Sequence, residues 1–342
     1  MKYYLALPAV LSFVMLALGQ PYPNPYRAVD DWAKLPVGRV MGAVGDVQVD
    51  PDGVHIWAVI RCDATEPERF GNECLDSDLD PILKFDADGN VVESFGGGMF
   101  IWPHGIFVDE DKNVWVTDAV RPDRTPKGLR GQKVVKFSPS GEVLMTLGVP
   151  GKAGKGNYQF NAPADVVIGN NGDIFIADGH NADGNNRVMV YSKDGTYLRE
   201  WGTSGYGPGE FHALHALAID KRGRLFVADR FNNRLQIFEQ DGTYVAQWTQ
   251  FGRPSGVFFD EHDKIYVSDS ESDDVQNPGW EMGIRIGDAK TGWVDYFILL
   301  PTGDPRFTKG NGAEFVTADA AGNLYGGEPS TRKLQKYVRV RP

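Results

Sequence analysis

A module that recurs along the chain limits the folds that this sequence can adopt. Each copy holds a short apolar strand, a turn of Asp, Gly or Asn, a second strand that ends in a small residue and an acid, and one or two further strands. The clearest copy runs from His215 to Trp248, with turns at Arg222-Gly223 and Asp241-Gly242. β-Branched and aromatic residues fill these strands, and the turn residues tolerate a positive φ. Repetition with a period of roughly 40–60 residues indicates a propeller or a similar array.

The register of the copies gives their number. Aligning the turns places six equivalent positions, called anchors below, in the first strands: Gly45, His104, Ala164, His215, Ser255 and Glu314. In five copies an acid follows the anchor by fourteen residues: Asp118, Asp178, Asp229, Asp269 and Glu328. The first copy differs, because an extra residue near Val54 leaves Val59 in the acid position. Six copies across residues 30–342 predict an all-β fold, a six-bladed β-propeller of repeated units.

The repeats also predict how the chain is divided. We expect a single domain over residues 20–342, because the alternative of two stacked sandwich domains would need a linker, and no break in composition marks one. The last copy lacks a fourth strand after Tyr337. The segment from Tyr26 to Trp32 is predicted to supply that strand and so to close the ring.

Residues 1–19 have the pattern of an export signal. Lys2 gives a positive start, Leu5 to Leu18 form an apolar run, and Ala17-Leu18-Gly19 provides a small-x-small cleavage site. The run is short for a membrane span. We therefore expect a secreted or periplasmic protein with no stable membrane span after signal cleavage. A retained N-terminal anchor is the alternative.

Charge and cysteine content narrow the partners and the compartment. The formal net charge is −11, whereas binding to nucleic-acid phosphates needs clustered Lys and Arg, so we expect no nucleic acid as a partner. Cys62 and Cys74 bracket a polar loop and predict a disulfide, which fits an oxidising compartment. Two cysteines alone do not make a zinc-site signature.

Three segments carry a resemblance to a known family. They are Trp102-Pro103-His104-Gly105-Ile106, Asn113 to Asp118, and Phe226 to Arg230. The repeats resemble NHL repeats, and these segments resemble peptidyl-α-hydroxyglycine α-amidating lyase, more closely a bacterial NHL group labelled after that lyase. The similarity covers most of the chain after the signal. NHL repeats occur in enzymes and in binding modules, so the anchor positions must discriminate between these classes.

The anchors predict a metal site. The first strand of each blade lines the central channel, so His104, His215 and Glu314, which come from alternate blades, should converge near the axis. Three such ligands hold one metal ion and leave a coordination position open. The blades between them offer only small anchors, which we expect to leave room for a substrate. The alternative is that the two histidines are core residues with backbone partners.

The resemblance bears on the choice of metal. In the lyase family the three positions are histidines that bind zinc, and here the third is Glu314. Two imidazoles and a carboxylate suit Zn²⁺ best, and also Fe²⁺ or Mn²⁺. The family's calcium-binding aspartate corresponds to Phe315, so structural Ca²⁺ is expected to be weak or absent.

Two arginines and a histidine complete the predicted site. Arg230 follows the acid of blade four, and Arg61 takes the same place in blade one; both match arginines of the lyase active site and could hold a substrate carboxylate. Pairing of Arg230 with a neighbouring acid is the alternative. His180 stands where the lyase has a tyrosine and is the candidate proton acceptor, with His212 and Tyr206 as rivals.

These residues favour an enzyme. The resemblance implies a metal-dependent carbon–nitrogen lyase that cleaves a carboxylate-bearing α-hydroxy amide, a small molecule or a peptide, to an amide and glyoxylate. One alternative is a metal-dependent ester or lactone hydrolase with the same site. The other is a non-catalytic NHL propeller that binds a protein or a glycan.

Overall fold

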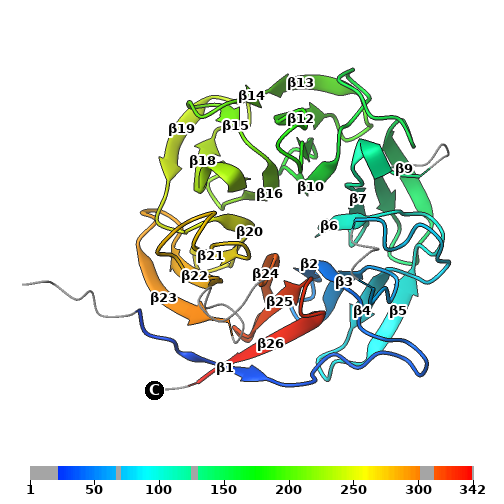
Figure 1. The fold of residues 1–342 in the computed structure, drawn as a ribbon, viewed down its shortest axis with the longest axis vertical. Coiled ribbons are helices and arrows are strands. Elements are labelled where there is room, and N and C mark those ends of the chain that lie inside the picture. The colour runs from blue at the N-terminus through cyan, green and yellow to red at the C-terminus, as the bar shows by residue number, and fades with distance from the viewer. Residues whose placement is uncertain (1–21, 67–70, 125–129, 301–311, 341–342) are drawn as a thin grey trace, which may run out of the picture.

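The structure, a computed structural model, describes residues 22–66, 71–124, 130–300 and 312–340. Six four-stranded antiparallel sheets stand like blades around a central channel (Figure 1). Within the described residues the only helical segments are two short 3₁₀ turns, η2 (Pro122–Arg124) and η3 (Arg230–Asn232). The predicted six-bladed β-propeller is confirmed. The predicted export signal lies outside the described residues.

Each blade runs outward from the channel, and its strands follow one another in the chain. The strands of blades one to three, innermost first, are β2 (Val44–Val49), β3 (Ile56–Ile60), β4 (Ile82–Phe85) and β5 (Val91–Phe95); β6 (Pro103–Val108), β7 (Val114–Asp118), β8 (Lys133–Phe137) and β9 (Val143–Gly148); β10 (Pro163–Ile168), β11 (Ile174–Asp178), β12 (Arg187–Tyr191) and β13 (Tyr197–Trp201). Those of blades four and five are β16 (Leu214–Ile219), β17 (Leu225–Asp229), β18 (Arg234–Phe238) and β19 (Tyr244–Trp248); β20 (Pro254–Phe259), β21 (Lys264–Asp269), β22 (Gly283–Asp288) and β23 (Val294–Leu299). A small parallel pair, β14 (Thr203–Ser204) and β15 (Glu210–Phe211), lies between blades three and four in the chain.

Blade six joins the two ends of the described chain. It consists of β24 (Phe315–Ala318), β25 (Leu324–Glu328), β26 (Lys333–Arg339) and, on the outside, β1 (Tyr26–Val29). β1 runs antiparallel to β26, with Tyr26 opposite Arg339 and Val29 opposite Lys336. In Figure 1 the blue strand β1 lies beside the red strand β26, so a strand from the beginning of the propeller completes its last blade.

In blades two to five the recurring acid fixes the segment that leads to the anchor. Asp118 lies opposite Pro103 and accepts the N–H groups of Ile101 and Trp102 at 3.1 and 2.9 Å. Asp229 holds the corresponding N–H of His212 at 2.7 Å. A buried carboxylate that accepts backbone N–H groups satisfies a turn that would otherwise carry unpaired donors. The acid therefore positions the anchors, which explains its constant spacing.

In blade one the register differs from the prediction. Val44, which precedes the anchor, lies opposite Ile60, so Ile60 and not Val59 takes the acid position. The extra residue in the β2–β3 turn shifts β3 by one place, and Ile60 is fully buried there. A one-residue shift moves each side chain of a strand to the other face. The next residue, Arg61, therefore occupies the same place as Arg230 in blade four.

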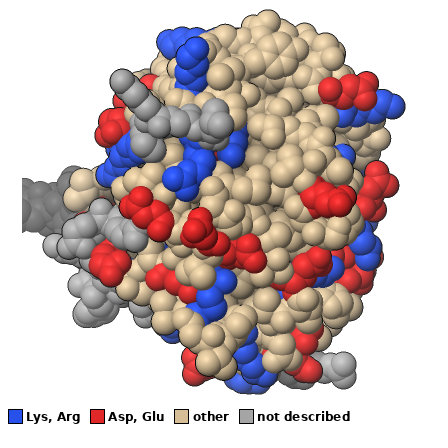
Figure 2. All heavy atoms as spheres, turned by 90° about the vertical axis from the view of Figure 1, so that its right-hand side faces the viewer, with Lys and Arg blue, Asp and Glu red and all other residues tan. Residues whose placement is uncertain are grey.

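The outer surface and the disulfide complete the fold. Cys62 and Cys74 form a disulfide with a Cα–Cα distance of 5.2 Å, as predicted. Figure 2 looks onto the edge of the ring from the right-hand side of Figure 1, and its Lys, Arg, Asp and Glu side chains are scattered among broad areas of other residues. None of the described residues belongs to a helix long and apolar enough to cross a membrane.

Candidate metal centre

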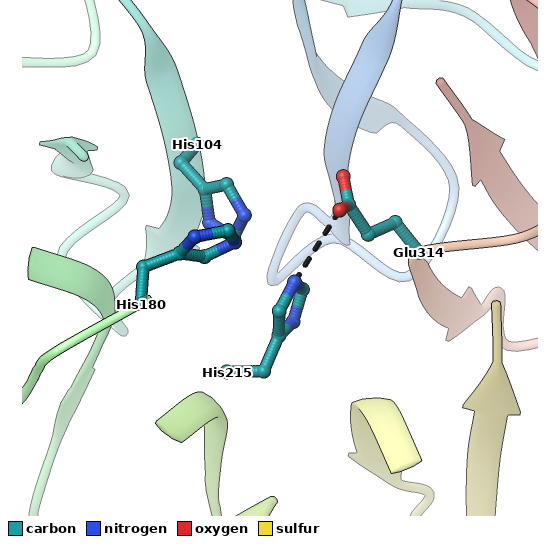
Figure 3. A group of neighbouring side chains, drawn as sticks. All are labelled: His104, His180, His215 and Glu314. Carbon is teal, nitrogen blue, oxygen red and sulfur yellow. Dashed lines mark hydrogen bonds and ion pairs between the residues drawn. The ribbon is translucent and has the colours of Figure 1, made fainter. Parts of the chain in front are cut away.

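Four side chains meet in the channel, and together they are called the donor cluster below: His104, His180, His215 and Glu314 (Figure 3). One nitrogen or oxygen atom of each lies within 4.8 Å of the corresponding atom of every other. All four residues are buried. The structure therefore brings together the three predicted ligands and adds a fourth residue to them.

Two of the histidines are aimed by the strands and by the next blade. His104 and His215 are the second residues of β6 and β16, and the ladder register shifts directly after each, a bulge that turns the side chain toward the channel. Nδ1 of His104 donates to the carbonyl oxygen of Ala164 at 2.8 Å, and Nδ1 of His215 donates to that of Ser255 at 2.9 Å. Each Nε2 is then free of hydrogen and faces the cluster. Such a backbone contact is the usual support of a metal-binding histidine.

The small anchors contact other residues of the site. Ala164 and Ser255 contribute the two carbonyl oxygens that hold the histidines. A Cβ atom on Gly45 would lie 3.1 Å from Nη2 of Arg61, so the missing side chain makes room for that guanidinium. At Gly45 the Arg61 guanidinium uses this room, and the expectation that the small anchors leave space for a substrate stays a prediction.

The carboxylate of Glu314 lies between two arginines. Nη2 of Arg61 is 3.3 Å from Oε2, and Nη1 of Arg230 is 3.9 Å from Oε1. Arg61 also donates from Nε to the carbonyl oxygen of Pro103 and stacks over the Trp102 ring at 4.6 Å. Both arginines are buried. Both arginines thus lie beside Glu314, and their predicted part in holding a substrate carboxylate stays a prediction.

Some of the arginine donors have no partner. Among the described residues, Nη1 of Arg61 and Nε of Arg230 are buried without a hydrogen bond. Arg230 pairs with Glu271 at 3.2 Å, and Glu271 also pairs with Arg253 at 3.1 Å. Unpaired buried guanidinium N–H groups are costly, so these atoms are suited to an anionic ligand.

Sequence reasoning missed the part played by the loop that holds Glu271. By composition alone, the acidic stretch from Asp269 to Asp274 is typical of a solvated loop. Instead, Asp269, Ser270 and Ser272 are buried, and the hydroxyl group of Ser272 donates to Asp269. Asp269 occupies the acid position that blades two, three, four and six share, and this position is the sequence signal that the start of the loop is buried.

His180 reaches the cluster from the loop after β11. Its backbone N–H donates to the carbonyl oxygen of Ala162 at 2.9 Å, and its ring centroid lies 4.5 Å from that of His104 and 5.0 Å from that of His215. Among the described residues neither ring nitrogen has a hydrogen-bond partner. The rival candidates lie outside the cluster: Tyr206 is 75% exposed, and His212 packs against it.

The protonation of the three imidazoles leaves them able to act as metal ligands. Burial lowers the pKa of each of the three histidines well below its ordinary value, so the imidazoles are neutral at pH 7. Nε2 of His215 lies 3.3 Å from Oε1 of Glu314, and the ring proton is already on Nδ1. The lone pair on Nε2 of His215 thus faces a lone pair on Oε1 of Glu314. A positive ion between them removes this repulsion.

The donor set fits a divalent metal ion. Ligand bonds of about 2 Å place donor atoms about 3–4 Å apart around one ion, so small side-chain rotations bring the four donors to that spacing. Imidazole nitrogen and carboxylate oxygen suit Zn²⁺, Fe²⁺ and Mn²⁺. Phe315, whose ring lies 5.5 and 5.2 Å from those of His104 and His215, covers the cluster with an apolar surface.

The channel continues beyond the cluster as a cavity of about 540 Å³. Its lining includes Asp46, Asp165 and the apolar side chains of the innermost strands. Oδ2 of Asp46 accepts the N–H of Ile106, and Oδ2 of Asp165 accepts that of Leu217, each from the neighbouring blade. These two carboxylates link blades and lie apart from the donor cluster.

The fold and the cluster define the class of protein: a six-bladed β-propeller with a candidate metal centre in its channel. A family model described as a 6-bladed beta-propeller, DUF5128, matches residues 162–224. The chain is 36% identical to NHL repeat-containing protein 3 of Homo sapiens over 156 residues, which are 44% of this chain and 42% of that protein. It is 29% identical over 202 residues to a probable peptidyl-alpha-hydroxyglycine alpha-amidating lyase of Caenorhabditis elegans, which is 56% of this chain and 54% of that protein.

The matched regions thus span about half or less of these relatives. A solved streptogramin B lyase superposes with a TM-score of 0.57 over 92% of this chain and 97% of that one, at 13% identity, which shows the fold alone. The resemblance to NHL-repeat propellers and to amidating lyases is confirmed.

Proposed function

We propose that this protein is a metal-dependent carbon–nitrogen lyase that acts on α-hydroxy amides bearing a carboxylate. The observation that carries the proposal is the donor cluster with Arg61 and Arg230 beside it, a set of ligands next to unpaired guanidinium donors. The similarity to amidating lyases supports this reaction class.

Each group has a part in the reaction. Nη1 of Arg61 and Nε of Arg230 bind the substrate carboxylate and orient the α-carbon toward the cluster. The metal held by the cluster, when bound, supplies a Lewis acid for the substrate hydroxyl group. The carbon–nitrogen bond breaks, its electron pair goes to nitrogen, and the hydroxyl proton is transferred to the leaving amide. The products are an amide and glyoxylate, without any oxidant.

Metal content and turnover test the proposal together. The purified protein should hold about one divalent ion per chain and convert α-hydroxyhippurate to benzamide and glyoxylate. His104→Ala and Glu314→Ala should each lower the metal content and reduce turnover at least about a hundredfold. Unchanged metal content in both variants would refute the metal site.

Two other outcomes identify the alternatives. A protein that keeps its metal but turns over only esters or lactones is a hydrolase. A protein with neither metal nor turnover is a binding propeller, and the similarity to NHL repeat-containing protein 3 supports that alternative. The disulfide between Cys62 and Cys74 supports action in an oxidising compartment, and we propose that the predicted signal directs the protein there.

A further inference from the structure

We infer that His180 is a fourth protein ligand of the metal, so that the centre holds three imidazoles and one carboxylate. This inference rests on the proposed metal centre. It also changes the expected role of His180, which the sequence suggested as the proton acceptor. The substrate then takes a fifth position on the metal rather than the fourth.

The ring of His180 lacks the hydrogen bonds that a buried imidazole normally makes. His180 is 7% exposed, and both ring nitrogens are buried without a hydrogen bond among the described residues. A buried imidazole usually gives its N–H to an acceptor and takes a donor on the other nitrogen. Burying an imidazole with neither contact is unfavourable unless a ligand binds one of its nitrogens. Nε2 of His104, which faces the same point, is also without a partner.

The ring of His180 also lies within reach of the other three donors. One nitrogen of His180 belongs to the set of atoms that lie within 4.8 Å of one another, so it can approach the same ion as the other three donors. Figure 3 shows the rings of His104 and His180 close together, facing Glu314 from the opposite side. A proton acceptor would need a free path to the substrate, whereas this ring lies among the ligands.

The backbone around Gly179 fixes the position of the His180 ring. Gly179 has a φ of 136°, and a Cβ atom there would lie 2.5 Å from the backbone nitrogen of Asn186. The N–H of His180 bonds to Ala162, two residues before Ala164, whose carbonyl oxygen holds His104. The same segment therefore positions both histidines, as a metal site requires of its ligands.

Four protein ligands favour a metal ion with a coordination number above four, because the substrate needs a further position. A zinc site with four protein ligands is commonly closed and structural, whereas a catalytic site keeps an open position. Fe²⁺, Mn²⁺ and Co²⁺ accept five or six ligands readily, and nitrogen with carboxylate donors suits them. The inference thus favours these ions over Zn²⁺ for activity.

Cobalt titration tests the assignment without measuring activity. Metal-free wild type, His180→Ala and His180→Gln are titrated with Co²⁺ against a competing chelator, and the visible spectrum is recorded. Loss of a ligand should weaken Co²⁺ binding at least about tenfold and shift the absorption bands. His212→Ala is the matched control, since it removes a histidine that packs against Phe231 and is not part of the donor cluster, and it should bind Co²⁺ within about twofold of wild type.

Two further readouts separate a ligand from a packing residue. Metal-free His180→Gln should unfold at a temperature close to that of metal-free wild type, because the His180 ring nitrogens have no hydrogen-bond partner to lose and glutamine fills much of the ring's volume. X-ray absorption of the Co²⁺-loaded wild type counts imidazoles directly, and three support the inference even if no variant folds. Two imidazoles, or unchanged affinity and spectrum in His180→Ala, overturn it while the metal centre stands. A wild type that binds no Co²⁺ refutes both proposals.

Discussion

Arg61 lies between the proposed metal ligands and the position that we propose for the substrate carboxylate. Its Nη2 contacts Glu314, its Nε is held by Pro103, and its Nη1 has no partner among the described residues. One planar group can thus touch a ligand and an incoming anion at fixed angles. Gly45 makes this position possible by leaving out a side chain.

Arg61→Lys should therefore separate binding from metal retention. Lysine keeps the positive charge near Glu314 but has no planar fork for a carboxylate. We expect KM for α-hydroxyhippurate to rise about tenfold or more, which corresponds to about 1.4 kcal/mol of binding, with metal content unchanged. Steady-state kinetics and elemental analysis measure both. An unchanged KM would mean that Arg61 serves only to balance the charge of Glu314.

The sequence predicted some of these residues better than others. His104, His215 and Glu314 follow from repeat register alone, since strand position decides which side chains face the channel. The placement of His180 depends on the path of a loop, which Gly179 and the residues after it determine through backbone geometry. Register carries no information about such a path. The sequence therefore identified His180 as a site residue, and its role as proton acceptor stays a prediction beside the ligand role that we infer.

At the scale of the strands, buried carboxylates connect neighbouring blades. Asp165 in β10 accepts the N–H of Val166 and, across the blade boundary, that of Leu217 in β16. Burial raises the pKa of Asp165 to about 8. Its protonated form is thus the stable one in the folded chain at neutral pH.

This pKa predicts how stability depends on pH. Folded Asp165 keeps a proton that the unfolded chain releases, so its contribution to the free energy of unfolding is largest in acid and is lost as the pH rises toward 8. The stability difference between wild type and Asp165→Asn should fall by about 1 kcal/mol or more between pH 5 and 8. Urea unfolding at both values measures it.

The exposed residue Asp111 offers a control for that experiment. Asp111→Asn, on a turn of blade two, should differ from wild type by the same amount at both pH values. An equal difference for Asp165→Asn at pH 5 and 8 would contradict a raised pKa. The register of blade one belongs to the same scale: the sequence shows the extra residue near Val54, and the structure shows that it moves Ile60 into the acid position in place of Val59.

For the whole molecule, the pairing of β1 with β26 closes the ring. Without β1, β26 would be an unprotected edge strand, which favours aggregation. The number of blades and the closing segment could both be read from the repeats, because a propeller must bury the edges of its blades. The cavity beyond the cluster could not, because its size depends on how six blades tilt together.

Removing β1 should weaken the whole ring. A variant that begins at Asp30 loses the strand, and we expect its unfolding temperature to fall by about 5 °C or more and its solubility to decrease. A variant that begins at Tyr26 keeps the strand and serves as the control. Thermal denaturation of both, without the signal, makes the comparison. Equal unfolding temperatures would show that β26 needs no partner.

The position of Glu314 has a consequence for the order of events during synthesis. His104, His180 and His215 leave the ribosome well before Glu314, which precedes the first strand of the last blade. Arg61, which holds the Glu314 carboxylate, comes from the first blade. The carboxylate thus joins the imidazoles only when the last blade has reached the first. The proposed metal centre is therefore complete only after the ring has closed.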